Sequence, residues 1–277
     1  MNALSQALYG EDEIDEDEIR FWLGTPDLLA FVALVDGEVA GYGDLSDGPV
    51  QWMDLRVPPG VGADGAAAGL IEALEGRAVA RKVRALVPSN DELLARLFGG
   101  RGYRVVRHSF RMYAGLDAPV ERPAWPEGLR VRAFAPGDDD VAVYEAHQES
   151  FADQHEFRRL SFTEWRRHQY REPFDPSLSF LAEEGGELAG ICLCRPKWGN
   201  NPALGWVSAL GVRRPWRRRG LGLALLLHAF GELQARGKRR VGLGVDGSNP
   251  TGAVRLYERA GMRVERRLDH CEKQLPA

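Results

Sequence analysis

The chain has 277 residues, of which 44% are hydrophobic and 27% are charged, and this composition excludes low-complexity and fibrous proteins. Its formal net charge is −4, so no basic excess favours nucleic acid as a partner. No apolar run reaches the roughly 20 residues that a membrane-spanning helix needs. We therefore expect one large or two small globular domains with no nucleic-acid and no membrane partner.

The three cysteines cannot all pair with one another. Cys192 and Cys194 alternate with apolar neighbours, as in a strand, and we expect them to be reduced structural thiols. No spacing groups the cysteines with the histidines into a metal site, so no metal is expected. The acidic stretch at residues 11–18 is interpreted as a solvated tail or helix face. Because it is not a basic leader, we expect a cytoplasmic protein.

Taken along the chain, the sequence contains one pattern twice, which predicts a duplication. Each copy is predicted as helices, a hairpin, a further strand, a turn, a long helix, a strand, a shorter helix and a last strand, in a mixed α/β fold. The proline-containing segment between the copies predicts a linker. Three blocks repeat in the same order: residues 31–41 and 180–190, residues 57–67 and 212–222, and residues 89–105 and 248–264. We expect domains at residues 1–118 and 129–277, joined by residues 119–128.

The second copy carries a turn suited to anions. It lies between a predicted strand at residues 205–212 and a predicted amphipathic helix at residues 221–236. A helix start leaves free N–H groups, and Gly220 and Gly222 lack the Cβ atoms that would keep a phosphate away. The adjacent arginines add charge-assisted hydrogen bonds. The alternative is a solvated basic loop with helix-capping glycines.

This block, Arg217-x-x-Gly220-x-Gly222 behind Val212, resembles the acetyl-CoA signature of the GCN5-related N-acetyltransferase (GNAT) superfamily. The run from Leu243 to Gly261 resembles that superfamily's downstream block. The resemblance implies two tandem GNAT-like domains, each with a mixed, mostly antiparallel twisted sheet flanked by helices, and a splayed strand pair in the second domain. It also implies acetyl-CoA as cosubstrate, held by Leu210, Gly211, Val212, Arg217, Arg218, Arg219, Gly220, Leu221, Gly222, Asn249, Ala253 and Tyr257.

By the same resemblance, Tyr257 is the general acid beside the departing CoA sulfur, a role that suits an O–H group near a thiolate. The alternative is a half-buried helix tyrosine. Gly242-x-Gly244-x-x-Gly247 also matches the dinucleotide fingerprint formally, but too few residues follow it for a dinucleotide-binding sheet.

The first copy has lost the features of a cofactor site. Gly62 and Asp64 stand at the positions matched to Arg217 and Arg219, and Phe98 stands at the position of Tyr257. We expect a degenerate domain that packs against the second and replaces the partner subunit of a dimeric relative, which allows a monomer. A second cofactor site in this copy is the alternative.

The segment at residues 149–156 resembles the mycothiol synthase-like group of tandem transferases. The carboxylate that such enzymes use as base would fall at Trp206, which cannot accept a proton and predicts an apolar or aromatic acceptor pocket. Glu156 is the first candidate for the base. The other candidates for the base are Glu149, Asp153, His155 and a water chain. The residues expected to face the acceptor are Asp153, His155, Glu156, Trp206 and Ser208.

These features predict an acyltransferase whose second domain transfers acetyl directly to the primary amine of a small molecule. No cysteine lies at a matching nucleophile position, which disfavours an acyl-enzyme. The alternatives are a protein or peptide N-acetyltransferase and a non-catalytic pseudo-enzyme that binds acyl-CoA or serves as a scaffold.

Overall fold

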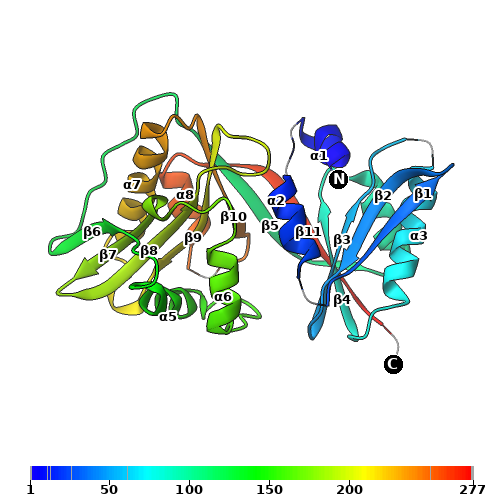
Figure 1. The fold of residues 1–277 in the computed structure, drawn as a ribbon, viewed down its shortest axis with the longest axis horizontal. Helices are drawn as coiled ribbons and strands as arrows, with labels where there is room; N and C mark the ends of the chain where they lie inside the picture. Colours follow the sequence, from blue (N-terminus) through cyan, green and yellow to red (C-terminus); the bar gives the residue numbers. More distant parts are fainter. Residues whose placement is uncertain are drawn as a thin grey trace. The chain divides into compact units, whose positions relative to one another are not determined.

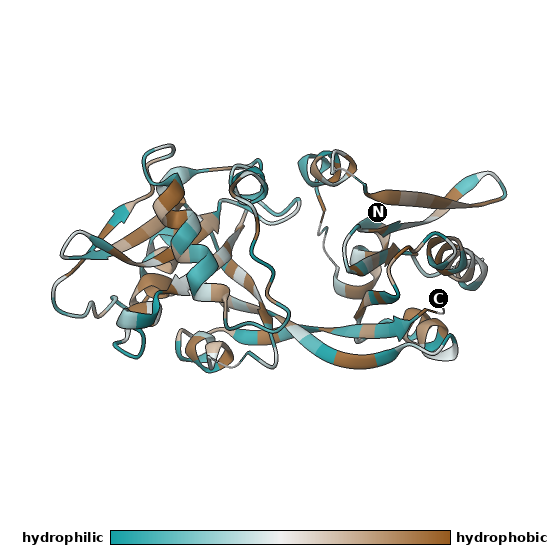
Figure 2. Ribbon diagram, turned by 90° about the horizontal axis from the view of Figure 1, so that it is seen from below, coloured by the Kyte–Doolittle hydropathy of each residue, from teal (hydrophilic) through white to brown (hydrophobic). Residues whose placement is uncertain are grey.

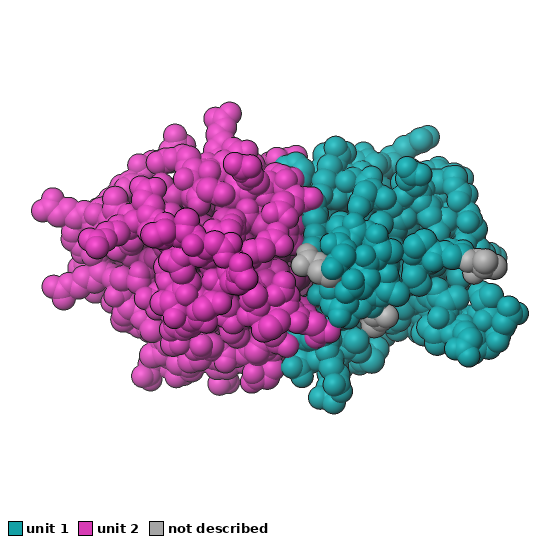
Figure 3. All heavy atoms as spheres, turned by 90° about the horizontal axis from the view of Figure 1, so that it is seen from above, with its two compact units in different colours: residues 1–110, 266–277 teal, residues 111–265 magenta. Residues whose placement is uncertain are grey.

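A computed structural model describes residues 2–10, 12, 14–25, 27–60, 62–249 and 251–275. The chain divides into two compact units (Figures 1 and 3): unit 1, residues 1–110 and 266–277, and unit 2, residues 111–265. None of the described helices is long and apolar enough to span a membrane. The acidic stretch falls partly on Glu11 and Glu13, outside the described residues; its end begins a helix, with Asp15 accepting the Glu18 N–H at 2.7 Å.

Unit 1 is a mixed sheet with helices, in the strand order β1-β2-β3-β4-β11-β5. Its core packs α3 against one face of this sheet. Its elements are α1 Asn2–Tyr9, α2 Glu16–Leu23, β1 Leu29–Val35, β2 Glu38–Leu45, β3 Val50–Arg56, α3 Ala63–Glu75, β4 Lys82–Pro88, α4 Glu92–Gly100, β5 Arg104–Gly115 and β11 Arg263–Gln274.

Unit 2 has the strand order β5-β10-β9-β8-β7-β6, with β5 contributing its end to this unit. Its elements are β6 Leu129–Ala133, α5 Asp140–Phe151, α6 Phe162–Gln169, the 3₁₀ turns Pro176–Leu178 and Arg214–Trp216, β7 Ser179–Glu184, β8 Glu187–Arg195, β9 Leu204–Val212, α7 Leu221–Ala235, β10 Arg240–Asp246 and α8 Ala253–Arg259. The predicted strand and helix around the anion turn differ from β9 and α7 by one residue each.

The predicted duplication is visible in the element order, because β1-β2-β3-α3-β4-α4-β5 recurs as β7-β8-β9-α7-β10-α8-β11. Both predicted hairpins form, each with a two-residue turn. Asp36 and Gly37 have φ of 53° and 86°, and Gly185 and Gly186 have φ of 62° and 86°. Positive φ at both turn residues matches the right-handed twist of the flanking strands.

The last strand of the chain belongs with the first copy. β11 pairs antiparallel with β4, from Leu268 opposite Pro88 to Gln274 opposite Lys82. The predicted boundaries at residues 118 and 129 therefore differ from the compact units, which meet at residues 110–111 and 265–266. A sequence repeat assigns each strand to its own copy, whereas backbone hydrogen bonds decide which sheet the strand completes.

In unit 2, helices cover both faces of the sheet around β9. A Cβ on Gly205 would lie 2.6 Å from Leu233 of α7, and a Cβ on Gly211 would lie 2.7 Å from Ser150 of α5. Residues six apart face the same side of a regular strand. These two face opposite sides because Ser208 is an extra residue, a bulge between the pairs Cys194–Val207 and Leu193–Ala209.

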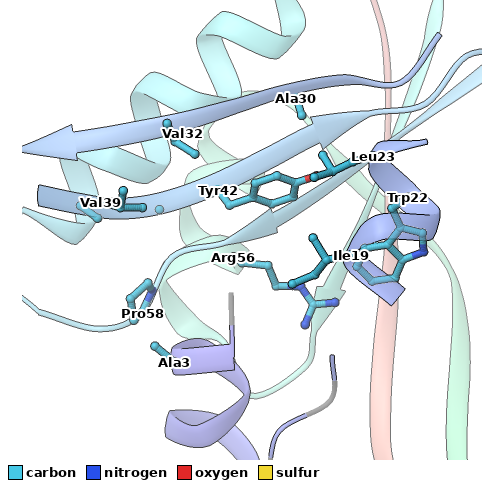
Figure 4. A pocket seen from close by; sticks show the side chains of 12 residues that line it. Ala3, Ile19, Trp22, Leu23, Ala30, Val32, Val39, Tyr42, Arg56 and Pro58 are labelled. Carbon is cyan, nitrogen blue, oxygen red and sulfur yellow. The ribbon is translucent and has the colours of Figure 1, made fainter. Parts of the chain in front are cut away.

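Unit 1 contains a pocket of about 430 Å³ between α1, α2 and the opposite sheet face (Figure 4). Ile19, Trp22 and Leu23 of α2 line it together with apolar residues of β1 and β2, while Tyr42 and Arg56 supply polar atoms. Strand β1 is apolar along its whole length, as Figure 2 shows. This pocket does not include the anion turn, which lies in unit 2.

Candidate active site

Strands β9 and β10 separate in the middle of unit 2. They pair in parallel from Leu204–Arg240 to Val207–Leu243. Beyond that point β9 runs on to Val212 and β10 to Asp246 without pairing with each other. The expected splay is therefore present, and it begins beside the bulge at Ser208. Backbone groups on the unpaired edge of β9 can hydrogen-bond an extended ligand as an added strand would.

The anion turn leads from this edge into α7. Gly220 is the N-cap with φ of 86°, and no side chain caps the helix. The first intrahelical bond runs from the Ala224 N–H to the Gly220 carbonyl at 3.1 Å. The N–H groups of residues 221–223 thus have no helical acceptor, and the positive end of the helix dipole adds to their attraction for an anion.

The two glycines of this turn have different physical roles. Gly220 adopts a left-handed conformation that L side chains disfavour, and a Cβ there would meet nothing within 4 Å. A Cβ on Gly222 would lie 3.0 Å from Leu256 Cδ1 and 3.6 Å from Val212 Cγ2. Gly222 therefore permits close packing of α7 against α8, and its role in clearing space for a phosphate stays a prediction.

Two of the three predicted phosphate arginines hold the turn itself. Arg217 donates from Nε to the Val212 carbonyl at 3.0 Å and from Nη1 to Asp153 at 2.7 Å. Arg219 donates to both oxygens of Glu184, at 2.9 and 2.6 Å. Arg218, with φ of 65°, is exposed and has no partner among the described residues. Arg218 is thus the arginine of this turn most available to an anion.

The carboxylates of the predicted acceptor segment are largely bound to the same turn. Asp153 accepts from Arg217 and Arg214, and both arginines lower the pKa of its carboxyl. Burial alone would raise the pKa of Glu149, but hydrogen bonds from Arg213 and from the Arg214 N–H lower it. A lowered pKa makes a carboxylate a poorer base.

Glu156 remains the favoured candidate for the base. It has φ of 53° and lies 3.7 Å from His155, with a side chain 38% exposed. Its role as base stays a prediction.

Tyr257 lies on α8 and is 9% exposed. Burial, and secondarily the nearby Cys192, raises the pKa of its hydroxyl, so the group stays protonated at neutral pH. Asn249 organises the turn before this helix, since its Oδ1 accepts from the Thr251 N–H at 2.9 Å and from the Thr251 hydroxyl at 2.5 Å. Ala253 is the first residue of α8. The arrangement offers a buried proton donor.

Trp206 is buried beneath other side chains, at 4% exposure. Trp198, in the connection from β8 to β9, stacks on it with ring centroids 4.0 Å apart. The guanidinium of Arg111 lies 5.2 Å from the Trp198 ring and 5.3 Å from the Trp206 ring. Sequence reasoning missed Arg111 and Trp198.

The signal that could have found them is the pair of alternating glycines, Gly242 and Gly244. A Cβ on Gly242 would meet Trp206 at 2.6 Å, and a Cβ on Gly244 would meet Arg111 Nη1 at 2.7 Å. The glycines that match the dinucleotide fingerprint, Gly242 and Gly244, therefore leave space for the large side chains of Trp206 and Arg111 on one face of β10.

Comparison with known proteins identifies the family. The acetyltransferase (GNAT) family model matches residues 141–262. Mycothiol acetyltransferase of Thermobispora bispora is 35% identical over 242 residues, covering 86% of this chain and 81% of the relative. That of Salinispora arenicola is 35% identical over 247 residues, covering 83% and 76%. The chain belongs to the GNAT family.

Solved structures agree with this assignment. A GCN5-related N-acetyltransferase from Sphaerobacter thermophilus has a TM-score of 0.76 and 33% identity, covering 99% of this chain and 90% of that one. A tandem GNAT protein from the clavulanic acid biosynthesis pathway has a TM-score of 0.75 at 19% identity, covering 100% and 93%, and shows the fold. The predicted tandem GNAT fold, the resemblance to the mycothiol synthase-like group and the acyltransferase class are confirmed. GNAT acetyltransferases use acetyl-CoA as acyl donor, and the open helix start and strand edge suit it.

In this GNAT protein, unit 1 keeps part of the same framework. β3 and β4 pair in parallel only as far as Met53–Ala85, so they also separate. The Phe98 carbonyl accepts from Arg101 and Tyr103, as the Tyr257 carbonyl accepts from Ala260 and Met262, which supports the predicted match of Phe98 with Tyr257. Pairing of β2 with β3 runs in uninterrupted register, without a counterpart of the Ser208 bulge.

The predicted match of the two turns is shifted. Gly62, with φ of 83°, is the N-cap of α3 and therefore corresponds to Gly220, not to Arg217. Asp64 then corresponds to Gly222, and it accepts from Arg96. The connection before α3 is shorter than the one before α7, and a gap-free match of the sequences could not show this.

Proposed function

We propose that unit 2 transfers an acetyl group from acetyl-CoA directly to the primary amine of a small molecule, and that unit 1 has a structural role. The observation that carries this proposal is the unpaired edge of β9 beyond Val207–Leu243, which connects the open start of α7 with the splay. Buried Tyr257 supplies a proton donor in the same unit. The loss of the bulge in unit 1 supports a single working domain.

In this proposal the N–H groups at the start of α7 and the side chain of Arg218 hold the pyrophosphate. N–H groups on the open edge of β9 bind the pantetheine arm and polarise the thioester carbonyl. The amine nitrogen bonds to the carbonyl carbon, the carbon–sulfur bond breaks, and Tyr257 donates its proton to the departing thiolate. The proton lost by the amine passes to Glu156 or to water.

The acceptor is proposed to be a small amine with an apolar or aromatic part. Relatives are named mycothiol acetyltransferase, but Trp206 stands where the family's basic carboxylate is expected, under the ring of Trp198. We expect Trp206→Glu to change the preferred amine. An unchanged preference would refute a role for Trp206 in acceptor selection.

The first experiment is a calorimetric titration of the full chain with acetyl-CoA. We expect one site per chain, weakened about tenfold or more by Arg218→Glu, because the change replaces a charge-assisted contact with repulsion. Arg263→Glu is the matched control, since Arg263 on β11 is also exposed. Two sites would return a cofactor role to unit 1, and the absence of binding would overturn the proposal. Release of CoA thiol with amines, compared with peptides, then tests the acceptor class.

A further inference from the structure

The side chain of Arg111 is a half-buried cation at the beginning of the splay. Its guanidinium lies over the Trp198 and Trp206 rings at 5.2 and 5.3 Å. Its Nη1 lies beside Gly244, where even a methyl group would come within 2.7 Å. The rings hold the guanidinium by cation–π attraction, and the missing side chain at residue 244 leaves space for it. Three parts of unit 2 therefore fix the position of this cation: the connection from β8 to β9, strand β9 and strand β10.

The Arg111 guanidinium has no hydrogen-bond or ion-pair partner among the described residues, although it can only donate. Asp246, two residues along β10 from Gly244, accepts instead from the Ser248 N–H at 2.8 Å. Arg240, over the neighbouring Tyr113 ring, is paired with Glu265 at 2.6 Å. Arg240 therefore has a carboxylate partner, whereas Arg111 has none among the described residues.

A second donor in the cluster is also unmatched. The indole Nε1 of Trp198 is buried and has no acceptor among the described residues. An indole N–H and a guanidinium both donate and cannot satisfy each other. Buried donors in native proteins nearly always have a partner. The missing partner is therefore a group that accepts hydrogen bonds.

The cluster lies at the beginning of the splay, where the proposed function brings the acceptor to the thioester. Val207–Leu243 is the last β9–β10 pair, so Gly244 stands level with Ser208, the first residue of the open edge of β9. Arg111 Nη1 is next to Gly244. The Arg111 guanidinium is thus at the beginning of the splay, away from the anion turn that follows β9.

We propose that Arg111 and Trp198 form an anion subsite that binds a carboxylate of the acceptor, so that the substrate is an amine bearing a carboxylate. This inference rests on the proposed function of unit 2 and names its substrate class. A planar guanidinium matches a carboxylate in two parallel hydrogen bonds. One unpaired cation balances the single negative charge of a carboxylate, whereas a phosphate dianion would leave a charge unbalanced.

The test uses the full chain and a set of amino acids paired with their neutral amides, with varied side chains. We expect the wild type to prefer the carboxylate member of an accepted pair by about 10- to 100-fold in kcat/KM, the size of a charge-assisted hydrogen bond. Arg111→Gln should remove this preference mainly through KM, while Arg111→Lys should retain part of it. Arg263→Gln, the same change at an exposed position of β11, should have no effect.

Equal use of both members by the wild type, or an equal loss for both in Arg111→Gln, would overturn the subsite and leave Arg111 with a structural role. Calorimetry separates this failure from failure of the proposed function. Carboxylate-dependent binding to the CoA complex without acetylation would support the subsite and refute the transferase proposal. Binding of no pair member to that complex would overturn the subsite even if acetyl-CoA itself binds.

Discussion

Gly211→Ala should weaken the hydrogen bonds that Glu149 makes to the anion turn. The added Cβ would lie 2.7 Å from Ser150 Cβ and 2.8 Å from its Oγ, whereas carbon atoms in contact are normally about 3.5–4.0 Å apart. Helix α5 must then move outward by about 1 Å. Glu149, its neighbour in the chain, holds Arg213 Nε at 2.7 Å and the Arg214 N–H at 3.0 Å. A movement of that size puts both bonds beyond the usual limit of about 3.2 Å.

We expect Gly211→Ala to destabilise unit 2 by about 1–3 kcal/mol, as overpacking does, and to weaken acetyl-CoA binding. Urea unfolding and calorimetry measure the two effects. Gly231→Ala in α7 is the control: a Cβ there meets nothing within 4 Å, so the change should stabilise the helix by about 0.5–1 kcal/mol.

A second variant tests whether the clash is the cause. Ser150→Gly alone should change stability little, because the cost of glycine in a helix, about 0.5–1 kcal/mol, offsets the gain from removing a buried hydroxyl that has no partner among the described residues. In the Gly211→Ala background the same change removes the clashing Cβ and should stabilise the protein. The reasoning is refuted if Gly211→Ala leaves stability unchanged, or if Ser150→Gly stabilises the Gly211→Ala variant no more than it stabilises the wild type.

Three further outcomes are expected. Tyr257→Phe should lower kcat about 10²–10⁴-fold without changing the Kd for acetyl-CoA, and an unaltered kcat would remove Tyr257 from the chemistry. Ser150→Ala should raise stability by about 1 kcal/mol, because its buried hydroxyl has no partner among the described residues; a loss of stability in urea would reveal one. Burial, with Asp54 adding to it, raises the pKa of Asp44 to about 7, above the value of about 3.9 for an unfolded chain, so the folded state loses stability as pH rises between these values. Asp44→Asn should therefore gain up to about 4 kcal/mol relative to wild type from pH 4 to pH 8, and a constant difference in urea unfolding would contradict this.

Local sequence chemistry predicted much of the active unit. The anion turn, the helix that follows it and the position of Tyr257 depend on glycines, arginines and apolar periodicity within short segments, and the structure places each as expected. The order of strands within each copy follows in the same way, because the hairpin turns need residues that tolerate positive φ.

The cluster at the splay could not be predicted in that way. Arg111 comes from β5, Trp198 from a loop after β8, and Gly244 from β10, so no motif contains all three. Likewise, Arg217 and Arg219 look alike in sequence, and only their carboxylate partners, Asp153 and Glu184, show that they hold the turn.

The amino-acid sequence by itself determined the family, the duplication and the chemistry of the anion turn, because these depend on residues close together in the chain. Tertiary structure decided which sheet β11 completes, where Ser208 reverses the faces of β9, and that Arg111 has no carboxylate partner among the described residues. Hydrogen-bond ladders, close packing and ion pairs join residues far apart in the chain, and their geometry exists only once the sheets have formed.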